Sequence, residues 1–232
     1  MRSHPLVTAT QRRLAALARR LKRDRAGMAA TEFALLLPLM VIMYFGVVEL
    51  TQGFSASRKL TYLGRDLADL AAQATSLTNS GGGNNDVNTI FGAASGVFYP
   101  FSGAKMTLTG IVFTTGSDGK VHAYTDWSVA TNSGTLRPCG ELPRTSTAGN
   151  SPPAVPDGLF VAGATVVAAD VSYNYTPILG SAFMSIGSNG TKLGTGTVTS
   201  IPMQHTSYMQ PRSVTRVPYT GSTGSCPNVT FP

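Results

Sequence analysis

The sequence predicts an α+β fold in which one long N-terminal helix precedes an antiparallel β-rich domain. An apolar run of membrane length lies near the N-terminus, and a stripe of apolar residues at helical spacing follows it. Further along, Gly, Ser and Thr become common and β-branched residues fill the apolar positions. We therefore divide the chain into a basic leader (1–27), a transmembrane helix (28–51), an amphipathic helix continuing it (52–79), a Gly-rich linker (80–100) and an exported β-rich domain (101–232).

The apolar run predicts a single membrane-spanning helix. Phe33 to Val48 is apolar apart from Tyr44, and with its flanks the run has roughly 20 residues, or about 30 Å as a helix. A cleaved secretory signal is the alternative, since Ser55-Ala56-Ser57 resembles a cleavage site after the run. The run is long for such a signal, so we expect an anchor in contact with membrane lipid.

The positive charge of the chain is confined to the leader. Residues 1–27 hold eight basic side chains and one acid, Asp24, giving 8 − 1 = +7, and from Met28 onward ten basic and ten acidic residues cancel. A basic tail before an apolar run is a topology signal rather than a nucleic-acid footprint. We expect no nucleic-acid partner, a cytoplasmic N-terminus in a bacterial inner membrane, and a periplasmic C-terminal part.

A second helical segment continues beyond the membrane. Its apolar residues are spaced by four and three in alternation and form one stripe: Ala56, Leu60, Leu63, Leu67, Leu70, Ala74 and Leu77. The stripe packs either on the protein's own sheet or on a partner helix in a coiled coil. Three consecutive glycines within Ser80–Asn85 then end the helix.

The remaining chain reads as strands joined by turns. Lys105–Thr115 and Lys120–Val129 flank a Gly-Ser-Asp-Gly turn and predict a hairpin. Further strands are expected over Leu159–Tyr175 and Thr195–Met203, and loops over 140–156 and 187–196. Trp127, Tyr173 and Tyr175 are expected to be core or sheet-face residues, and Asp170 a structural partner for a turn.

The two cysteines, Cys139 and Cys226, both fall in the exported part. They make no CxxC pair, so one disulfide is the plain expectation in an oxidising compartment, and two free buried thiols are the alternative. His4, His122 and His205 are scattered, and no nucleophile, phosphate-loop or metal-ligand motif is present. We predict no enzyme activity, no metal site and no cofactor.

Glu32 stands at the start of the apolar run, where a carboxylate is costly unless it is hydrated or paired. Basic residues, Gly27, four residues and then Glu32-Phe33 before an apolar helix resemble a type IV prepilin peptidase site, which is cut between Gly27 and Met28. Such a cut removes the leader and creates an amine that would neutralise Glu32 of a neighbouring subunit. The alternative is that Glu32 stays hydrated at the level of the lipid headgroups.

The stretch DRAGMAATEFALLLPL, residues 24–39, resembles the signature of the TadE-like pseudopilins of tight-adherence (Tad, or Flp-type) pilus systems. VSYNYTPIL (171–179) and YMQPR (208–212) resemble two further segments of that family. The resemblance implies processing by a prepilin peptidase, assembly with other pilin or pseudopilin subunits, and a minor role in pilus biogenesis. Two other functions stay open: an uncut single-pass anchor displaying an adhesive or scaffolding domain, and a membrane-tethered periplasmic enzyme.

Overall fold

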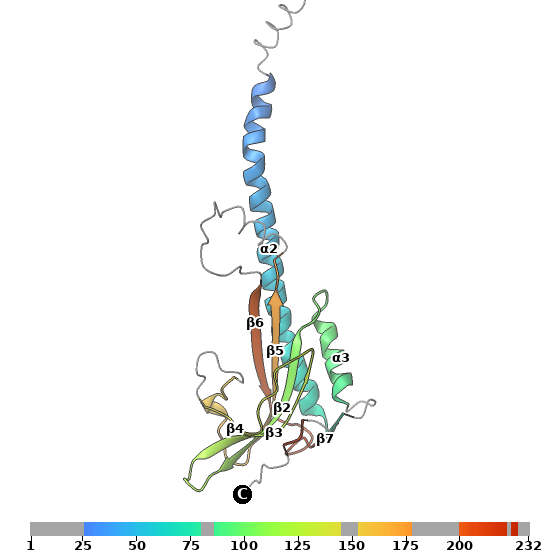
Figure 1. Cartoon of the computed structure of the whole chain (residues 1–232), viewed down its shortest axis with the longest axis vertical. Coiled ribbons are helices and arrows are strands. Elements are labelled where there is room, and N and C mark those ends of the chain that lie inside the picture. Colours follow the sequence, from blue (N-terminus) through green and yellow to red (C-terminus); the bar gives the residue numbers. More distant parts are fainter. Residues whose placement is uncertain (1–25, 80–85, 145–152, 178–199, 222–223, 227–232) are drawn as a thin grey trace, which may run out of the picture. The chain divides into compact units, whose positions relative to one another are not determined.

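The computed structural model describes residues 26–79, 86–144, 153–177, 200–221 and 224–226. The predicted leader up to residue 25 and the predicted loop 187–196 lie outside these residues. The chain divides into two compact units, with the division between Leu50 and Thr51. Figure 1 gives the order of the elements.

The first described element is α2 (Ala26–Gln73), a helix of 48 residues that contains Pro38. The helix predicted to reach residue 79 is therefore too long, because it ends at Gln73. Leu77, the last residue of the predicted stripe, instead lies in the short strand β1 (Leu77–Thr78) and is fully buried. β1 pairs in parallel with β7 (Tyr219–Thr220), so burial of Leu77 is achieved by strand pairing rather than by another helical turn.

The linker predicted over 80–100 is wrong in its second half, which contains a helix. This helix, α3 (Val87–Val97), starts after Asp86, whose carboxylate accepts a hydrogen bond from the Asn88 backbone N–H at 2.8 Å. An aspartate in this position satisfies one of the unpaired amides at the start of a helix. α3 buries four apolar residues against the domain: Val87, Ile90, Phe91 and Ala94.

The predicted antiparallel sheet is present, and the described residues contribute five strands to it. Its order is β4-β3-β2-β5-β6, and every neighbouring pair is antiparallel. The bounds are β2 Lys105–Thr115, β3 Val121–Thr131, β4 Gly140–Glu141, β5 Thr165–Tyr175 and β6 Ile201–Met209.

The predicted hairpin corresponds to β2 and β3, joined at the expected turn. The strand predicted from Leu159 begins only at Thr165, because a 3₁₀ turn, η1 (Asp157–Leu159), precedes it. The strand predicted to end at Met203 continues to Met209 as β6, and its predicted residues 195–199 lie outside the described ones. β4 forms at the start of the predicted loop 140–156.

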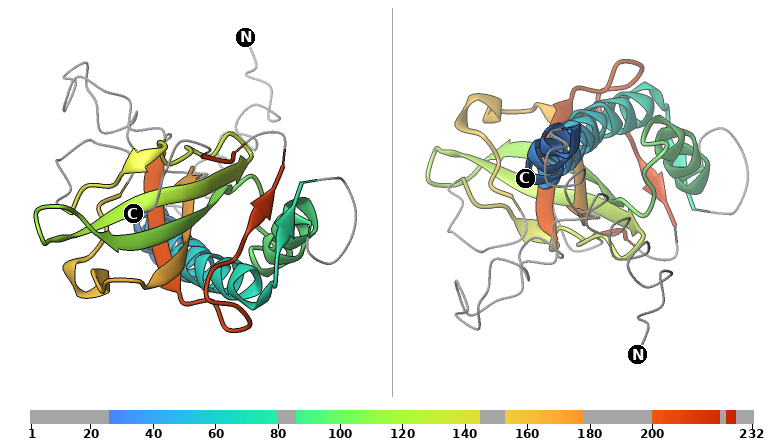
Figure 2. Two further views of the ribbon diagram at one scale, coloured as in Figure 1. Left: turned by 90° about the horizontal axis from the view of Figure 1, so that it is seen from below. Right: turned by 90° about the horizontal axis from the view of Figure 1, so that it is seen from above.

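Within the second unit, the part of α2 from Thr51 onward lies across one face of the sheet (Figure 2). Side chains alternate along β5, so Val167, Ala169 and Val171 join the core beneath the helix while Val166 and Ala168 join a smaller core on the other face. The stripe therefore packs on the protein's own sheet through Leu60, Leu63 and Leu67. Leu70 is the exception, with 38% of its surface exposed.

The predicted disulfide is formed between Cys139 and Cys226, whose Cα atoms lie 5.4 Å apart. Their sequence separation is 87 residues, so the bond links the segment after β3 to the C-terminal segment of the chain. Trp127 is also where the sequence suggests, buried in the core with its indole N–H donating to the Val217 carbonyl at 2.9 Å.

Candidate functional site

The four residues predicted to direct processing and assembly lie close together at the start of α2. Gly27 and Met28 fall in the first turn of the helix, and Glu32 and Phe33 follow one turn later. The Thr31 hydroxyl donates to the Met28 carbonyl at 2.8 Å, as is common in a helix. Met28 and Glu32 are four residues apart and therefore share one face of the helix.

The Glu32 side chain is exposed, and so are its neighbours Met28 (56% of its surface) and Phe33 (58%). Within the described part of the chain, no hydrogen bond or ion pair engages the Glu32 carboxylate. The exposed carboxylate is therefore accessible to water or to a partner from another molecule.

The segment that follows exposes a large apolar surface. Its exposed large hydrophobic residues include Leu35, Leu36, Leu37, Leu39, Met40, Val41, Ile42, Met43, Tyr44, Phe45, Val47 and Leu50. Soluble proteins rarely leave so large a continuous apolar surface in water. Among the described residues, this is the one helix long and apolar enough to cross a membrane, and it fits a single-pass membrane protein.

Gly64 allows the second part of α2 to approach the sheet closely, because a Cβ atom there would lie 3.1 Å from both the Val171 and the His205 side chains. A Cβ atom on Gly53 would lie 3.7 Å from the Tyr175 ring, which is an ordinary contact distance. Val171 and Tyr175 belong to the VSYNYTPIL stretch. The helix therefore packs on the end of β5, to which residues 171–175 of this stretch belong.

The arginine of the YMQPR stretch contacts the C-terminal end of α2. The Arg212 backbone N–H donates to the Ala72 carbonyl at 3.0 Å, and its guanidinium pairs with Asp69 at 2.6 Å. The Ser213 hydroxyl donates to the Gln73 carbonyl at 3.2 Å. Carbonyls in the last turn of a helix have no partner inside the helix, so these contacts fix where α2 ends.

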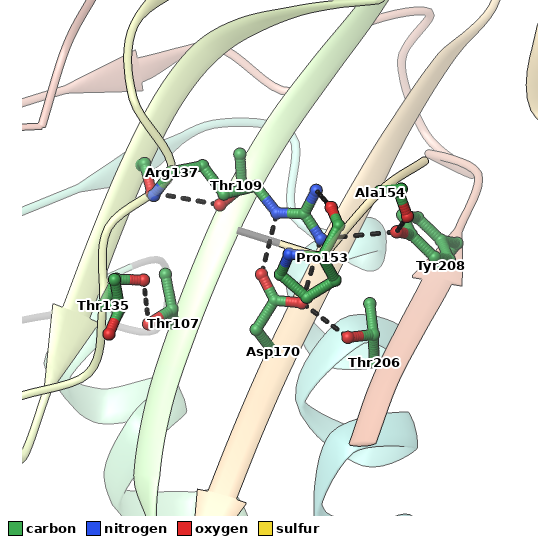
Figure 3. A network of polar contacts seen from close by, with 10 residues as sticks. Thr107, Thr109, Thr135, Arg137, Pro153, Ala154, Asp170, Thr206 and Tyr208 are labelled. Carbon is green, nitrogen blue, oxygen red and sulfur yellow. Dashed lines mark hydrogen bonds and ion pairs between the residues drawn. The ribbon is translucent and has the colours of Figure 1, made fainter. Parts of the chain in front are cut away.

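The face of the sheet opposite α2 carries a buried polar network (Figure 3). Arg137, which the sequence analysis does not single out, extends over β5 and donates two hydrogen bonds to Asp170, at 2.8 and 2.9 Å. Asp170 also accepts from the Thr206 hydroxyl at 2.7 Å, and Arg137 contacts Tyr208 on β6 at 3.3 Å. Burial alone would lower the pKa of Arg137, but the Asp170 carboxylate outweighs it and raises that pKa.

The network confirms that Asp170 is a structural partner, although the group it holds is a guanidinium rather than a turn. Its carboxylate oxygens accept hydrogen bonds from Arg137 and Thr206. A small cavity of about 90 Å³ lies beside it, lined in part by Lys105, Ser172 and Gln204.

The two described histidines occupy opposite electrostatic settings. His122 lies between Glu141, 2.5 Å from Nδ1, and Asp118, 3.0 Å from Nε2, and hydrogen bonds to these carboxylates raise its pKa. Burial and the charge of Arg65 lower the pKa of His205. His4 lies outside the described residues. Across the described ranges, no group of three or more His, Cys, Asp or Glu side chains is arranged to hold a metal ion.

Comparison with known proteins gives one match. Residues 27–69 match the family model described as TadE-like protein, so the match starts at Gly27 and ends within the part of α2 that packs on the sheet. The VSYNYTPIL and YMQPR stretches lie outside the matched residues. No curated protein and no solved structure matches the chain. The matched segment confirms the predicted resemblance: residues 27–69 are similar to the TadE-like family.

Proposed function

We propose that the chain is a minor pilin-like subunit, cut by a prepilin peptidase between Gly27 and Met28 and assembled through its N-terminal helix. The TadE-like match carries this proposal, since it starts at Gly27 and covers the helix that would remain after the cut. A C-terminal unit of this size with its own cores and a disulfide suits an occasional, priming or tip subunit better than a repeating one.

The proposed topology places the N-terminus in the cytoplasm and the second unit in the periplasm. The eight basic side chains before the apolar run favour this orientation, because Lys and Arg are retained on the cytoplasmic side. The disulfide between Cys139 and Cys226 agrees with an oxidising compartment for the second unit.

Glu32 has the assembly role in this proposal. Its carboxylate is unpaired among the described residues and precedes a run of exposed apolar side chains. A buried, uncompensated charge costs about 3–5 kcal/mol, so helices packing together at this level require a counter-charge near Glu32. The amine created at Met28 of a neighbouring subunit would supply it, and would align the two helices along their length.

Replacing Glu32 tests this role. In cells that make the pilus, the chain carrying Glu32→Ala should still be cut at Met28 but should be largely absent from sheared filaments. Glu49→Ala is the matched control, because it removes the same charge from the same helix near the other end of the apolar run. Normal filament incorporation of the Glu32 variant would overturn the assembly role.

The apolar helix also suits a second function, in which the chain is not cut at Gly27. The chain is then a permanent single-pass anchor that displays an adhesive or scaffolding domain. Retention of residues 1–27 in the mature protein would favour the anchor.

We also infer that the chain is not an enzyme, because the carboxylate of Asp170 is engaged by Arg137 and Thr206 and no metal-binding cluster is found among the described residues.

A further inference from the structure

Side chains from three parts of the sequence gather at the end of the second unit where α2 enters it. A Cβ atom added to Gly53 would lie 3.7 Å from the Tyr175 ring of β5, and Tyr175 pairs with Ile201 of β6, so these strand ends lie beside the first residues of the unit. The Lys59 ammonium donates to the Tyr99 carbonyl, which brings the turn between α3 and β2 to the same end (Figure 1). We name this region the entry surface and define it by Phe54, Arg58, Lys59, Tyr99, Lys105 and Ile201.

The entry surface exposes aromatic and aliphatic side chains to an unusual degree. Phe54 has 70% of its surface exposed, Tyr99 has 76% and Ile201 has 47%. Such side chains next to cations are typical of proteins that lie in the interfacial layer of a membrane.

The charge of the entry surface is of one sign. The six residues that define it include three basic residues, Arg58, Lys59 and Lys105, and no acidic one, or +3. The other described residues of the second unit contain six basic and eight acidic residues, so 6 − 8 = −2. The cations are therefore concentrated at the end where the chain arrives from the apolar helix.

The helical part of the entry surface follows the apolar run by only a few residues of the same helix, which limits its distance from the membrane. Thr51 is the first residue of the second unit, and Phe54 and Lys59 follow it in the same helix by about 4.5 and 12 Å along the axis. If the apolar run before Thr51 spans the bilayer, these residues lie within or just outside the headgroup layer. Long basic side chains then extend toward the lipid phosphates.

We propose that the entry surface binds anionic phospholipid headgroups, so that the second unit sits directly on the membrane in which its helix is anchored. The inserted side chains are Phe54, Tyr99 and Ile201, and the phosphate-binding cations are Arg58, Lys59 and Lys105. The inference rests on the membrane anchor but on neither cleavage nor filament assembly, so it can fail while those hold.

The test uses the full-length chain in vesicles, with an environment-sensitive fluorophore (NBD) on a new cysteine and the native disulfide left oxidised. Ser102→Cys places the probe on the entry surface, and Ser117→Cys places it on the exposed turn between β2 and β3, away from the entry surface. The probe at 102 should become brighter, shift to the blue and resist an aqueous quencher when phosphatidylglycerol is added to phosphatidylcholine. The probe at 117 should not change, and high salt should reverse the effect at 102.

Substitutions then test whether positive charge is required. Arg58→Gln with Lys105→Gln should reduce the ratio of second units that contact the membrane to those that do not by roughly 25-fold, since each cation near an anionic surface contributes about fivefold. Arg58→Lys with Lys105→Arg keeps both charges, so this matched control should retain the membrane contact. Trp127 emission checks that each variant is folded, because this tryptophan is buried in the core. Equal responses in the two lipid mixtures at position 102, or equal responses at 102 and 117, would overturn the proposal.

Discussion

Asp170→Ala is predicted to destabilise the second unit because it leaves a buried guanidinium without its counter-charge. The Asp170 carboxylate accepts hydrogen bonds from Arg137 at 2.8 and 2.9 Å and from Thr206 at 2.7 Å. The Arg137 side chain is fully buried, and after the substitution it keeps only the Pro153 carbonyl and the Tyr208 hydroxyl as partners. Removing one partner of a buried ion pair costs about 3–5 kcal/mol.

The Asp170 side chain retains 16% exposure, so we expect the lower end of that range, about 3 kcal/mol. For a unit of this size, this corresponds to a fall in Tm of roughly 6–12 °C. The assay is thermal and urea unfolding of the full-length chain in detergent. Emission from the buried Trp127 provides the signal, because it is the one tryptophan in the sequence.

Two further variants test whether the loss of stability comes from the unpaired Arg137 charge. Asp157→Ala removes an exposed carboxylate that lies 3.7 Å from Arg144, and it should change stability by less than about 1 kcal/mol. The double variant Arg137→Met with Asp170→Ala should lose much less than the sum of the two single variants, because the unpaired charge is gone. Additive losses, or an Asp170 variant as stable as the Asp157 variant, would refute the account of the network.

Three other perturbations have defined outcomes. Gly110→Ala should cost about 1–3 kcal/mol in urea unfolding, because the added Cβ would lie 2.4 Å from the Trp127 indole nitrogen. His122→Asn should lower stability below pH 6.5, where the raised pKa of His122 stabilises the folded protein, and this difference should fade as the pH rises through that raised pKa; unfolding curves across pH measure it. Replacing Cys139 and Cys226 by Ser together should lower stability by about 2–5 kcal/mol, measured by urea unfolding against the oxidised wild type.

Each of these predictions has a control within the chain. Gly92→Ala adds a Cβ with no atom within 4 Å and should not destabilise as Gly110→Ala does. His205 has a lowered pKa, so it destabilises the fold as the pH falls below 6.5, and His205→Asn should remove that loss. A chemical reductant should reproduce the effect of the double Ser substitution. Matching pH profiles for the two histidine variants would contradict the assigned electrostatics.

The features that local patterns encode could be predicted from the sequence. The alternation of apolar residues and the Gly-Ser-Asp-Gly turn were sufficient for the hairpin of β2 and β3. The stripe containing Leu60, Leu63 and Leu67 was sufficient to place the amphipathic helix. The apolar run after Glu32 was likewise sufficient to predict the helix that contains it.

The features that depend on distant partners could not be predicted. The end of α2 is set by Arg212 and Ser213, which are far from Ala72 in the sequence. Arg137 bonds to Asp170 across 33 residues, and no local pattern distinguishes this arginine from an exposed one. α3 does not follow from the local pattern, because its short apolar run comes after three glycines and resembles a linker, although Asp86 caps its N-terminus.

The N-terminus of the protein isolated from membranes tests the central proposal most directly, by intact mass and by end sequencing. We predict a chain that starts at Met28 and has 232 − 27 = 205 residues. A start at Met1 would contradict processing and leave a permanent anchor, and a start beyond residue 50 would contradict the membrane-anchored pilin-like subunit altogether.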